Sequence, residues 1–267
     1  MSVAGRVARL LDCDVTGGRR LSGGDLSEVH QIERADGHRL IAKSAPTAAA
    51  EATMLRAIAA TGAPVPAVVA VGTDLIVMEE IVASGLLGGV AWSNLAEVLD
   101  QLHAAGDHAY GWDVDHSFGP VAIVNERSAD WPRFWADHRL RCHLPHVDPA
   151  LGRRVGRLAD ALPDHLPGRP AASLLHGDLW GGNVLVSGDR IAALIDPACY
   201  YGDREVDIAM LTLFDSPPAD FLDDLALEPG WRVRLPVYRL WPLLVHLRLF
   251  GSGYAAQVDA ALSALDY

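Results

Sequence analysis

Short runs of alternating apolar and polar residues occupy much of the first 80 positions. Residues 28–33 alternate with the period of two that marks a half-buried strand, and Asp36-Gly37 is a two-residue hairpin signal. Residues 39–43 are then the returning strand, and two further apolar runs, 67–71 and 75–79, flank a Gly-Thr-Asp turn. This part of the chain is predicted to form a small antiparallel sheet.

Helical spacing replaces this alternation in other segments. Residues 2–11 predict a short amphipathic helix, and residues 47–60 (TAAAEATMLRAIAA) predict a helix of high propensity with Thr47 as its N-cap. Gly62 and the prolines after it end that helix. Beyond residue 80 the composition becomes helical between loops that contain Gly and Pro. The helices expected there are 91–105, 131–143, 149–162, 203–214 and 231–267, the last in two pieces.

The order of these elements predicts an α+β fold with two lobes. Residues 1–80 are expected to form a small β-rich lobe with one helix between its strands, and residues 81–267 a larger, mainly helical lobe. A chain of 267 residues is long enough for both. Because ligands commonly bind where two lobes meet, a cleft is expected at their junction.

Composition excludes several classes of protein. Half of the residues are hydrophobic and 21% are charged, which is a globular balance and argues against disorder. The net charge of −12 argues against a general nucleic-acid or anionic-membrane binder, which needs a positive field. The three cysteines are far apart, and residues 1–14 lack a long apolar run, so we expect a cytoplasmic protein in a reducing compartment.

The basic residues are divided very unevenly between their two types. The chain has 22 of them, and Lys43 is the single lysine. A general preference for arginine explains the other basic residues but leaves this exception unexplained. A lysine that persists against such a preference marks a position where a compact ammonium group on a flexible stem is required. Lys43 is therefore a candidate functional residue.

The densest chemical signal lies between residues 174 and 198. A buried strand is expected to lead into a loop that carries Asp178 and Asn183, and a short apolar hairpin then returns the chain to Asp196. Phosphoryl transfer from a nucleotide needs two carboxylates and an amide in such an arrangement. The first carboxylate accepts or orients the proton of the attacking hydroxyl, and the amide and the second carboxylate hold magnesium on the phosphates.

Three features that precede this segment fit the same chemistry. Gly23 and Gly24 lie in a glycine-rich loop before a strand, and Lys43 ends the strand that follows. Glu51, eight residues after Lys43, is the only carboxylate of the next expected helix. In kinase-type sites a lysine so placed contacts the phosphates and is held by a glutamate from the next helix. The loop is not a Walker A loop, which would need a Gly-Lys-Ser/Thr ending.

At these residues the sequence resembles the fructosamine kinase (ketosamine-3-kinase) family, whose members are related to aminoglycoside and choline phosphotransferases and have a protein-kinase-like fold. The resemblance covers nearly the whole chain. The string HGDLW-x-GN at 176–183, together with YGDRE-x-D at 201–207, is specific to this family. The other matching segments are Gly23-Gly24, Lys43, Glu51, 118–125, 130–140, 196–198 and 250–254.

The resemblance implies an activity and a role for each site residue. Asp178 is the implied catalytic base, Asn183 and Asp196 the implied magnesium ligands, and Lys43 with Glu51 the pair that contacts the phosphates. Backbone groups near Met78, Glu79, Glu80 and Ile81 are implied to hold adenine. The family transfers the γ-phosphate of ATP to the 3-hydroxyl of a ketosamine, and the 3-phosphate makes the adduct prone to eliminate and free its amine.

Three further residues are candidates for substrate contact. Trp180 is expected to be partly exposed beside the catalytic loop, where its face could stack on a sugar or on the alkyl stem of an amine, or pack between loop and helix. Asp203 and Glu205 could attract the ammonium group of the substrate. Asp207 is expected to have a structural role at the start of the next helix.

Two other functions remain open from the sequence. One is a phosphotransferase of the same superfamily that acts on an aminoglycoside, choline or a similar amino alcohol. The other is a nucleotide-binding module without catalytic activity. The expected partners are ATP, Mg²⁺ and a free or protein-bound ketosamine, with no nucleic acid and no membrane. No residue identifies the preferred sugar, and a monomer is only the default expectation for the oligomeric state.

Overall fold

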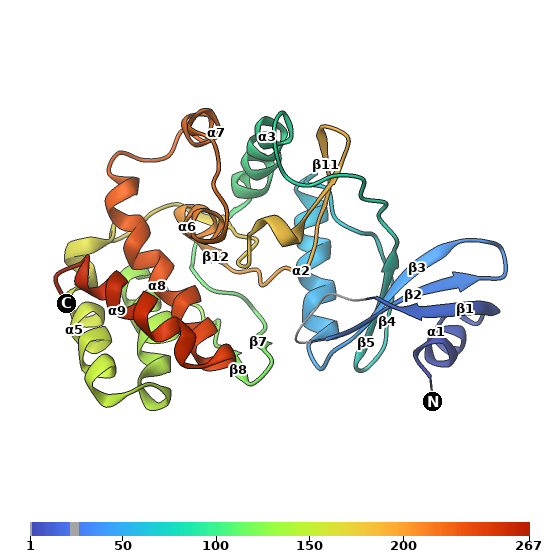
Figure 1. Cartoon of the computed structure of the whole chain (residues 1–267), viewed down its shortest axis with the longest axis horizontal. Coiled ribbons are helices and arrows are strands. Elements are labelled where there is room, and N and C mark those ends of the chain that lie inside the picture. The colour runs from blue at the N-terminus through green and yellow to red at the C-terminus, as the bar shows by residue number, and fades with distance from the viewer. Residues whose placement is uncertain (1, 22–26) are drawn as a thin grey trace. The chain divides into compact units, whose positions relative to one another are not determined.

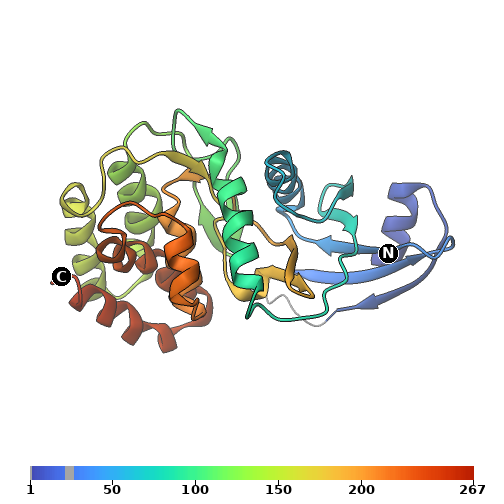
Figure 2. The same cartoon turned by 90° about the horizontal axis from the view of Figure 1, so that it is seen from above.

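The computed structural model describes residues 2–21 and 27–267. Gly23 and Gly24 of the expected glycine loop lie outside the described residues. The chain divides into two compact units, one made of residues 1–98 and 182–197 and the other of residues 99–181 and 198–267. Figure 1 labels most of their helices and strands, and Figure 2 shows the same ribbon from a second direction.

The first unit contains a five-stranded antiparallel sheet. Its strand order is β1-β2-β3-β5-β4, so β3 and β5 lie in the interior of the sheet. The register pairs Val29 of β2 and Ile76 of β5 with Lys43 of β3. The alternating segments of the sequence therefore form the predicted sheet. The strands are β1 (Val15–Arg20), β2 (Glu28–Arg34), β3 (Arg39–Ser44), β4 (Val68–Val71) and β5 (Leu75–Glu79).

Alternation along β5 divides the core of this unit between two helices. Leu75 and Val77 pack in a cluster with Val7 of α1 (Val3–Leu11). Ile76 and Met78 point to the other face and pack with α2 (Ala48–Ala60). Successive side chains of a strand point to opposite faces, so one strand can serve both clusters. α2 begins after Thr47 as expected, but the Thr47 side chain makes no capping hydrogen bond to the described residues.

A hairpin from later in the chain completes the first unit. β10 (Val184–Ser187) and β11 (Arg190–Leu194) pair in antiparallel register. The backbone N–H of Leu194 donates to the carbonyl of Pro64, just after α2, at 2.8 Å. The N–H of Ile191 donates to the side chain of Asn94 in α3 (Ala91–Ala104), also at 2.8 Å. These bonds anchor the segment that carries Asn183 and Asp196.

The second unit is mainly helical. The segment predicted as one helix over 131–143 is α-helical only as α4 (Trp131–Trp135) and continues as a π-helix (Ala136–Leu140) and a 3₁₀-helix (Arg141–His146). In the 3₁₀ segment, Pro145 lacks the N–H that an α-helix would direct to the carbonyl of Arg141. The last helical segment has two main pieces, as expected. The other helices are α5 (Pro149–His165), α6 (Glu205–Phe214), α7 (Ala219–Asp224), α8 (Trp231–Phe250) and α9 (Ala255–Ser263).

Short strands and α7 of the second unit were not anticipated. β9 (Ala172–Leu174) lies between β6 (Gly106–Asp107) and β12 (Tyr201–Gly202), and β7 (His116–Phe118) pairs with β8 (Val121–Ile123). Two or three residues are too few to show a periodic pattern. Together with the first unit, these elements confirm the predicted α+β class.

Aromatic side chains form much of the core of the second unit. Trp131 is fully buried, and its Nε1 donates to the hydroxyl of Tyr238 at 2.9 Å. The guanidinium carbon of buried Arg139 lies 4.2 Å from the ring centroid of Tyr200 and 4.8 Å from that of Phe134. Cation–π contacts of this kind offset part of the cost of burying an arginine. Within the described ranges, no helix is long and apolar enough to cross a membrane.

Candidate active site

Lys43 forms two ion pairs inside the first unit. Its Nζ lies 2.8 Å from Oε2 of Glu51 in α2 and 2.8 Å from Oδ1 of Asp196, which follows β11. Lys43 is 8% exposed and Glu51 is 2% exposed, whereas the Asp196 side chain is 42% exposed. The structure therefore brings together three residues that the sequence analysis selected.

The charge of Lys43 is stabilised by these two neighbours. Burial acts to lower its pKa, but the carboxylates of Glu51 and Asp196 outweigh burial, and the pKa of Lys43 is raised. The ammonium group is therefore charged at neutral pH. The ammonium group of Lys43 is a compact point charge on a flexible stem, and such a group can contact an anionic ligand such as a phosphate chain.

Asp196 has an unusual backbone conformation. Its φ is 53°, in the left-handed region that residues other than glycine adopt infrequently. The backbone N–H of Ile195 donates to the carbonyl of Asn183 at 3.0 Å, which places the two chain segments side by side. Asn183 is buried and ends a 3₁₀ turn before β10. Backbone strain of this kind is concentrated at functional sites.

The donor chemistry of Asn183 and Asp196 fits a magnesium ion. An amide oxygen and a partly exposed carboxylate are hard oxygen ligands, and Mg²⁺ is commonly bound by one or two such groups together with phosphates and water. No cluster of three or more His, Cys, Asp or Glu residues suited to a metal occurs in the described part of the chain. Such a cluster is not required when the nucleotide supplies further ligands.

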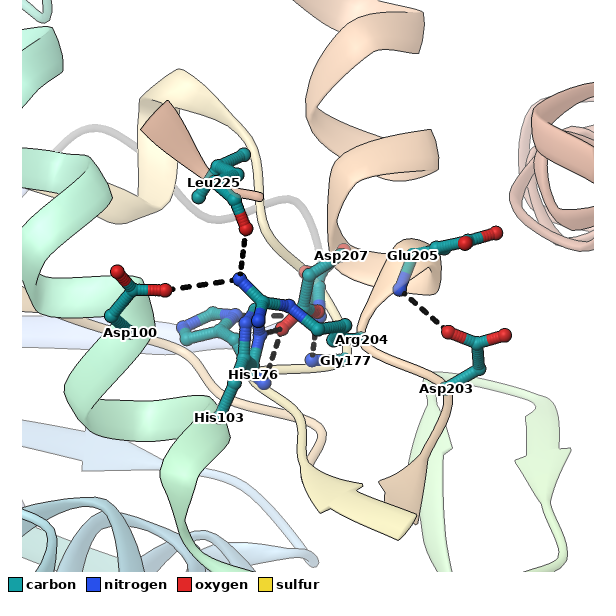
Figure 3. A network of polar contacts seen from close by, with 10 residues as sticks. Asp100, His103, His176, Gly177, Asp203, Arg204, Glu205, Asp207 and Leu225 are labelled. Carbon is teal, nitrogen blue, oxygen red and sulfur yellow. Dashed lines mark hydrogen bonds and ion pairs between the residues drawn. The ribbon is translucent and has the colours of Figure 1, made fainter. Parts of the chain in front are cut away.

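The loop that carries Asp178 belongs to the second unit and is held by Asp207. Oδ2 of Asp207 accepts the backbone N–H of His176, and Oδ1 accepts that of Gly177, each at 2.9 Å (Figure 3). The N–H of Asp178 donates to Nδ1 of His176 at 3.3 Å, so that this nitrogen is unprotonated. Three successive backbone N–H groups are thereby fixed, and Asp178 itself is partly exposed.

Gly177 is required by the close approach of two chain segments. Its φ is +79°, and a Cβ at this position would lie 2.1 Å from the carbonyl oxygen of Ala198. The N–H of Ala198 donates to the carbonyl of His176 at 2.8 Å. No side chain can occupy this space, which explains glycine directly before Asp178 in physical terms.

His103 is a residue of this network that sequence reasoning missed. It lies in the last turn of α3, and its Nε2 is 2.9 Å from Oδ2 of Asp207. Burial acts to raise the pKa of Asp207, but hydrogen bonding to His103 and the nearby backbone N–H groups lower it overall. Because Asp207 is a carboxylate, Nε2 of His103 donates. A histidine at the end of an amphipathic helix carries no local signal for this role.

The segment expected to hold adenine lies at the end of β5. Met78 and Glu79 belong to the strand, and the N–H of Glu79 donates to the carbonyl of Ala67 at 3.0 Å. Glu80 accepts from the side chain of Gln31 and lies 3.2 Å from Nε of Arg39. Its side chain therefore stabilises the strand end, and contact of this segment with adenine stays a prediction.

The three candidate substrate residues differ in exposure. Trp180 is 42% exposed, and its ring meets that of Phe214 edge to face at 6.5 Å. Asp203 accepts from Tyr238 Oη at 2.7 Å, and Glu205 pairs with Arg234 at 2.5 Å. The side chains of Asp203 and Glu205 are thus buried and paired within the chain. Their contact with substrate stays a prediction, whereas exposed Trp180 is accessible to a ligand.

Known proteins resemble this chain in sequence. A probable ketoamine kinase of Synechocystis is 36% identical over 187 residues, which cover 64% of this chain and 61% of that protein. A protein-ribulosamine 3-kinase of rice is 32% identical over 185 residues, covering 65% of this chain and 53% of that protein. The chain thus aligns with less than two thirds of the length of these relatives.

Solved structures and a family model cover the whole chain or nearly all of it. A Thermobifida fusca protein described as a candidate fructosamine-3-kinase has a TM-score of 0.88 and 33% identity, covering 100% of this chain and 99% of that one. An aminoglycoside phosphotransferase in complex with ADP and hygromycin B has a TM-score of 0.69 at 21% identity, covering 99% and 97%, which shows a shared kinase-like fold. The model of the fructosamine kinase family matches residues 8–266. The chain therefore belongs to the fructosamine kinase family.

Proposed function

We propose that this protein is an ATP-dependent kinase that phosphorylates the 3-hydroxyl of ketosamines. The observation that carries the proposal is the pairing of the single lysine, Lys43, with both Glu51 and Asp196 in a chain of this family. The names of the relatives from Synechocystis and rice support ketoamine and ribulosamine substrates. The ADP bound in the aminoglycoside phosphotransferase supports use of an adenine nucleotide.

In the proposed reaction, Asp178 accepts the proton of the 3-hydroxyl as the oxygen attacks the γ-phosphorus of ATP. The bond between the γ-phosphorus and the β–γ bridging oxygen breaks, and ADP leaves. Lys43, held by Glu51, binds the phosphate chain, and Asn183 and Asp196 hold magnesium. Bound magnesium neutralises the charge that develops on the phosphate oxygens. The Asp207 hydrogen bonds keep the backbone before Asp178 in one conformation, which favours a fixed position of the base.

The remaining roles follow the same proposal. Gly23 and Gly24 cover the phosphates, and backbone groups near Met78, Glu79, Glu80 and Ile81 hold adenine, so residues 1–80 form the nucleotide-binding lobe. Residues 81–267 carry catalysis and the acceptor. We further propose a cytoplasmic protein that acts on free or protein-bound ketosamines in repair of glycated amines. The 3-phosphate of the product makes the adduct prone to eliminate.

Two alternatives remain as outcomes of the test. One is phosphorylation of an aminoglycoside, choline or similar amino alcohol, which the shared fold with the aminoglycoside phosphotransferase keeps open. The other is nucleotide binding without catalysis. The paired state of Lys43, Glu51 and Asp196 argues against the second, because a scaffold without catalytic activity has no need to retain all three.

Release of ADP from Mg-ATP tests the proposal. The acceptors are ribulose and fructose adducts of one amine, an aminoglycoside and choline. We expect release with the ketosamines alone. ADP release only with the aminoglycoside or choline would support a kinase and would overturn the proposal that ketosamines are its substrates. ATP binding without release in any of the reactions would favour the module without catalysis.

A further inference from the structure

An exposed row of aromatic rings in the second unit extends from the loop of Asp178. The rings belong to Trp180, Phe214, His246, Phe250 and Tyr254, and we call them the aromatic strip. Ring centroids of successive members lie 6.5 Å apart for Trp180 and Phe214, 4.9 Å for Phe214 and His246, and 5.4 Å for His246 and Phe250. Tyr254 lies 5.1 Å from His246.

These rings are unusually exposed for large aromatic groups in contact with one another. Trp180 is 42% exposed, Phe214 37% and Phe250 49%, while His246 and Tyr254 are partly exposed. By contrast, Trp131, Phe134 and Trp135 of the same unit are fully buried. Contiguous exposed apolar groups of this kind are typical of ligand and interaction sites.

The beginning of the aromatic strip is fixed to the loop by a backbone contact. The N–H of Gly181 donates to Oδ2 of Asp215 at 2.7 Å, and a Cβ on Gly181 would lie 2.5 Å from Oδ1. Gly181 follows Trp180, and Asp215 follows Phe214. This bond therefore holds the rings of Trp180 and Phe214 beside each other. Trp180 lies only two residues after Asp178 in the chain.

The middle of the aromatic strip is uncharged. Nδ1 of His246 donates to the carbonyl of Pro242 at 2.7 Å, and burial lowers the pKa of His246. The imidazole is therefore neutral at pH 7, and its Nε2 can only accept a hydrogen bond. Arg239, two turns earlier on α8, donates to Thr212 Oγ1 at 2.8 Å, so this N–H group is engaged with α6. Neutral aromatic faces favour alkyl chains and ammonium groups.

We infer that the aromatic strip binds the amine side of the ketosamine, namely the alkyl stem attached to the sugar, as in a glycated lysine side chain. This inference rests on the proposed function. The secondary ammonium group that joins sugar and stem suits the Trp180 face, and the stem extends along Phe214, His246 and Phe250. A row of rings offers more surface than the sugar alone can cover, so the amine contributes to affinity.

The test compares two acceptors that carry the same sugar. One is the ribulose adduct of methylamine, and the other is the ribulose adduct of the side chain of Nα-acetyl-lysine amide. The measured quantity is the ratio of their KM values, methylamine adduct over lysine adduct. We expect a ratio of roughly 10 for the natural sequence, since burial of several methylene groups is worth more than 1 kcal/mol. In Phe250→Ala the ratio should fall to roughly 2 because a ring of the strip is lost.

Val233→Ala is the matched control. Val233 is also in α8 and is 76% exposed, but it is not a member of the aromatic strip. It should leave the ratio unchanged, and thermal melts should show that both variants fold. Equal KM values for the two adducts in the natural sequence, or a ratio that Phe250→Ala leaves intact, would overturn the inference. No ADP release with either adduct would instead be the failure of the proposed function, which removes the basis of this inference as well.

Discussion

Nε2 of His103 lies 2.9 Å from Oδ2 of Asp207, and both side chains are buried, although 104 residues separate them in the chain. The same carboxylate accepts the backbone N–H groups of His176 and Gly177 (Figure 3). The last turn of α3, which contains His103, and the first turn of α6, which contains Asp207, thus meet at the backbone that precedes Asp178. The position of the proposed base depends on residues distant from it in sequence.

Replacing His103 tests this relationship. His103→Ala leaves the buried Asp207 carboxylate without its side-chain donor, and loss of a hydrogen bond to a buried charged group costs about 2–3 kcal/mol. We expect the free energy of unfolding in urea to fall by that order and kcat to fall more than KM for ATP rises. His108→Ala, on an exposed side chain nearby in sequence, is the control. A His103→Ala protein with natural stability and kcat would contradict the assigned role.

The close contact at Gly177 can be tested by comparing alanine substitutions at two glycines, Gly177 and Gly188. Gly177→Ala would place a Cβ 2.1 Å from the carbonyl oxygen of Ala198 and requires a left-handed backbone, so it should destabilise by several kcal/mol, of the order of 3 or more. Gly188→Ala shares a positive φ, of +59°, but meets no atom within 4 Å. It should cost only about 1 kcal/mol. Similar melting temperatures for the two variants would refute the steric argument.

The buried carboxyl of Asp203 predicts a pH dependence of stability. Burial, with repulsion from Glu205, raises its pKa to about 6. Between pH 4 and 6 the folded state keeps this proton and the unfolded state loses it, so the free energy of unfolding contributed by this group falls as pH rises. In the natural sequence this group should lower the free energy of unfolding by about 2–3 kcal/mol across this window, and Asp203→Asn should abolish that decrease. Urea titrations at pH 4 and pH 7 measure it, and equal pH dependence in both proteins would contradict the prediction.

We expect that arginine cannot replace lysine at position 43. Lys43 is buried between Glu51 and Asp196 at 2.8 Å from each, and a planar guanidinium is larger and differently shaped. Lys43→Arg should lower kcat/KM for ATP by a factor of roughly 100 or more while the protein remains folded. Arg39→Lys, at an exposed position of the same strand, is the control. Natural activity in Lys43→Arg would show that the lone lysine has no functional cause.

Much of the first unit could be predicted because alternation and turn signals are local. The strands 39–43 and 75–79 and the helix 47–60 coincide closely with β3, β5 and α2. Lys43 was identified by composition, which needs no knowledge of the fold. The motif spacing around Asp178 likewise lies within one short segment. Each of these signals can be found along the chain without knowing what folds against it.

The contacts that hold the loop could not be predicted, for a physical reason. His103 and Asp207 acquire their roles through tertiary packing, and neither residue type is unusual in or near a helix end. The aromatic strip combines residues from the loop, α6, α8 and the segment before α9, whose proximity only the fold reveals. Asp203 and Glu205 were candidates for attracting the ammonium group of the substrate, but Tyr238 and Arg234, about 30 residues later, pair with them.

Asp178 is the proposed base of a ketosamine kinase. Asp178→Asn preserves size and removes the carboxylate, so ADP release with a ribulose adduct should fall by a factor of roughly 100 to 10,000, which is what general-base catalysis supplies. Nucleotide affinity, measured by calorimetry with Mg-ADP, should change less than about threefold. An Asp178→Asn protein that binds Mg-ADP normally and turns over at the natural rate would contradict the assignment of the base and with it the proposed mechanism.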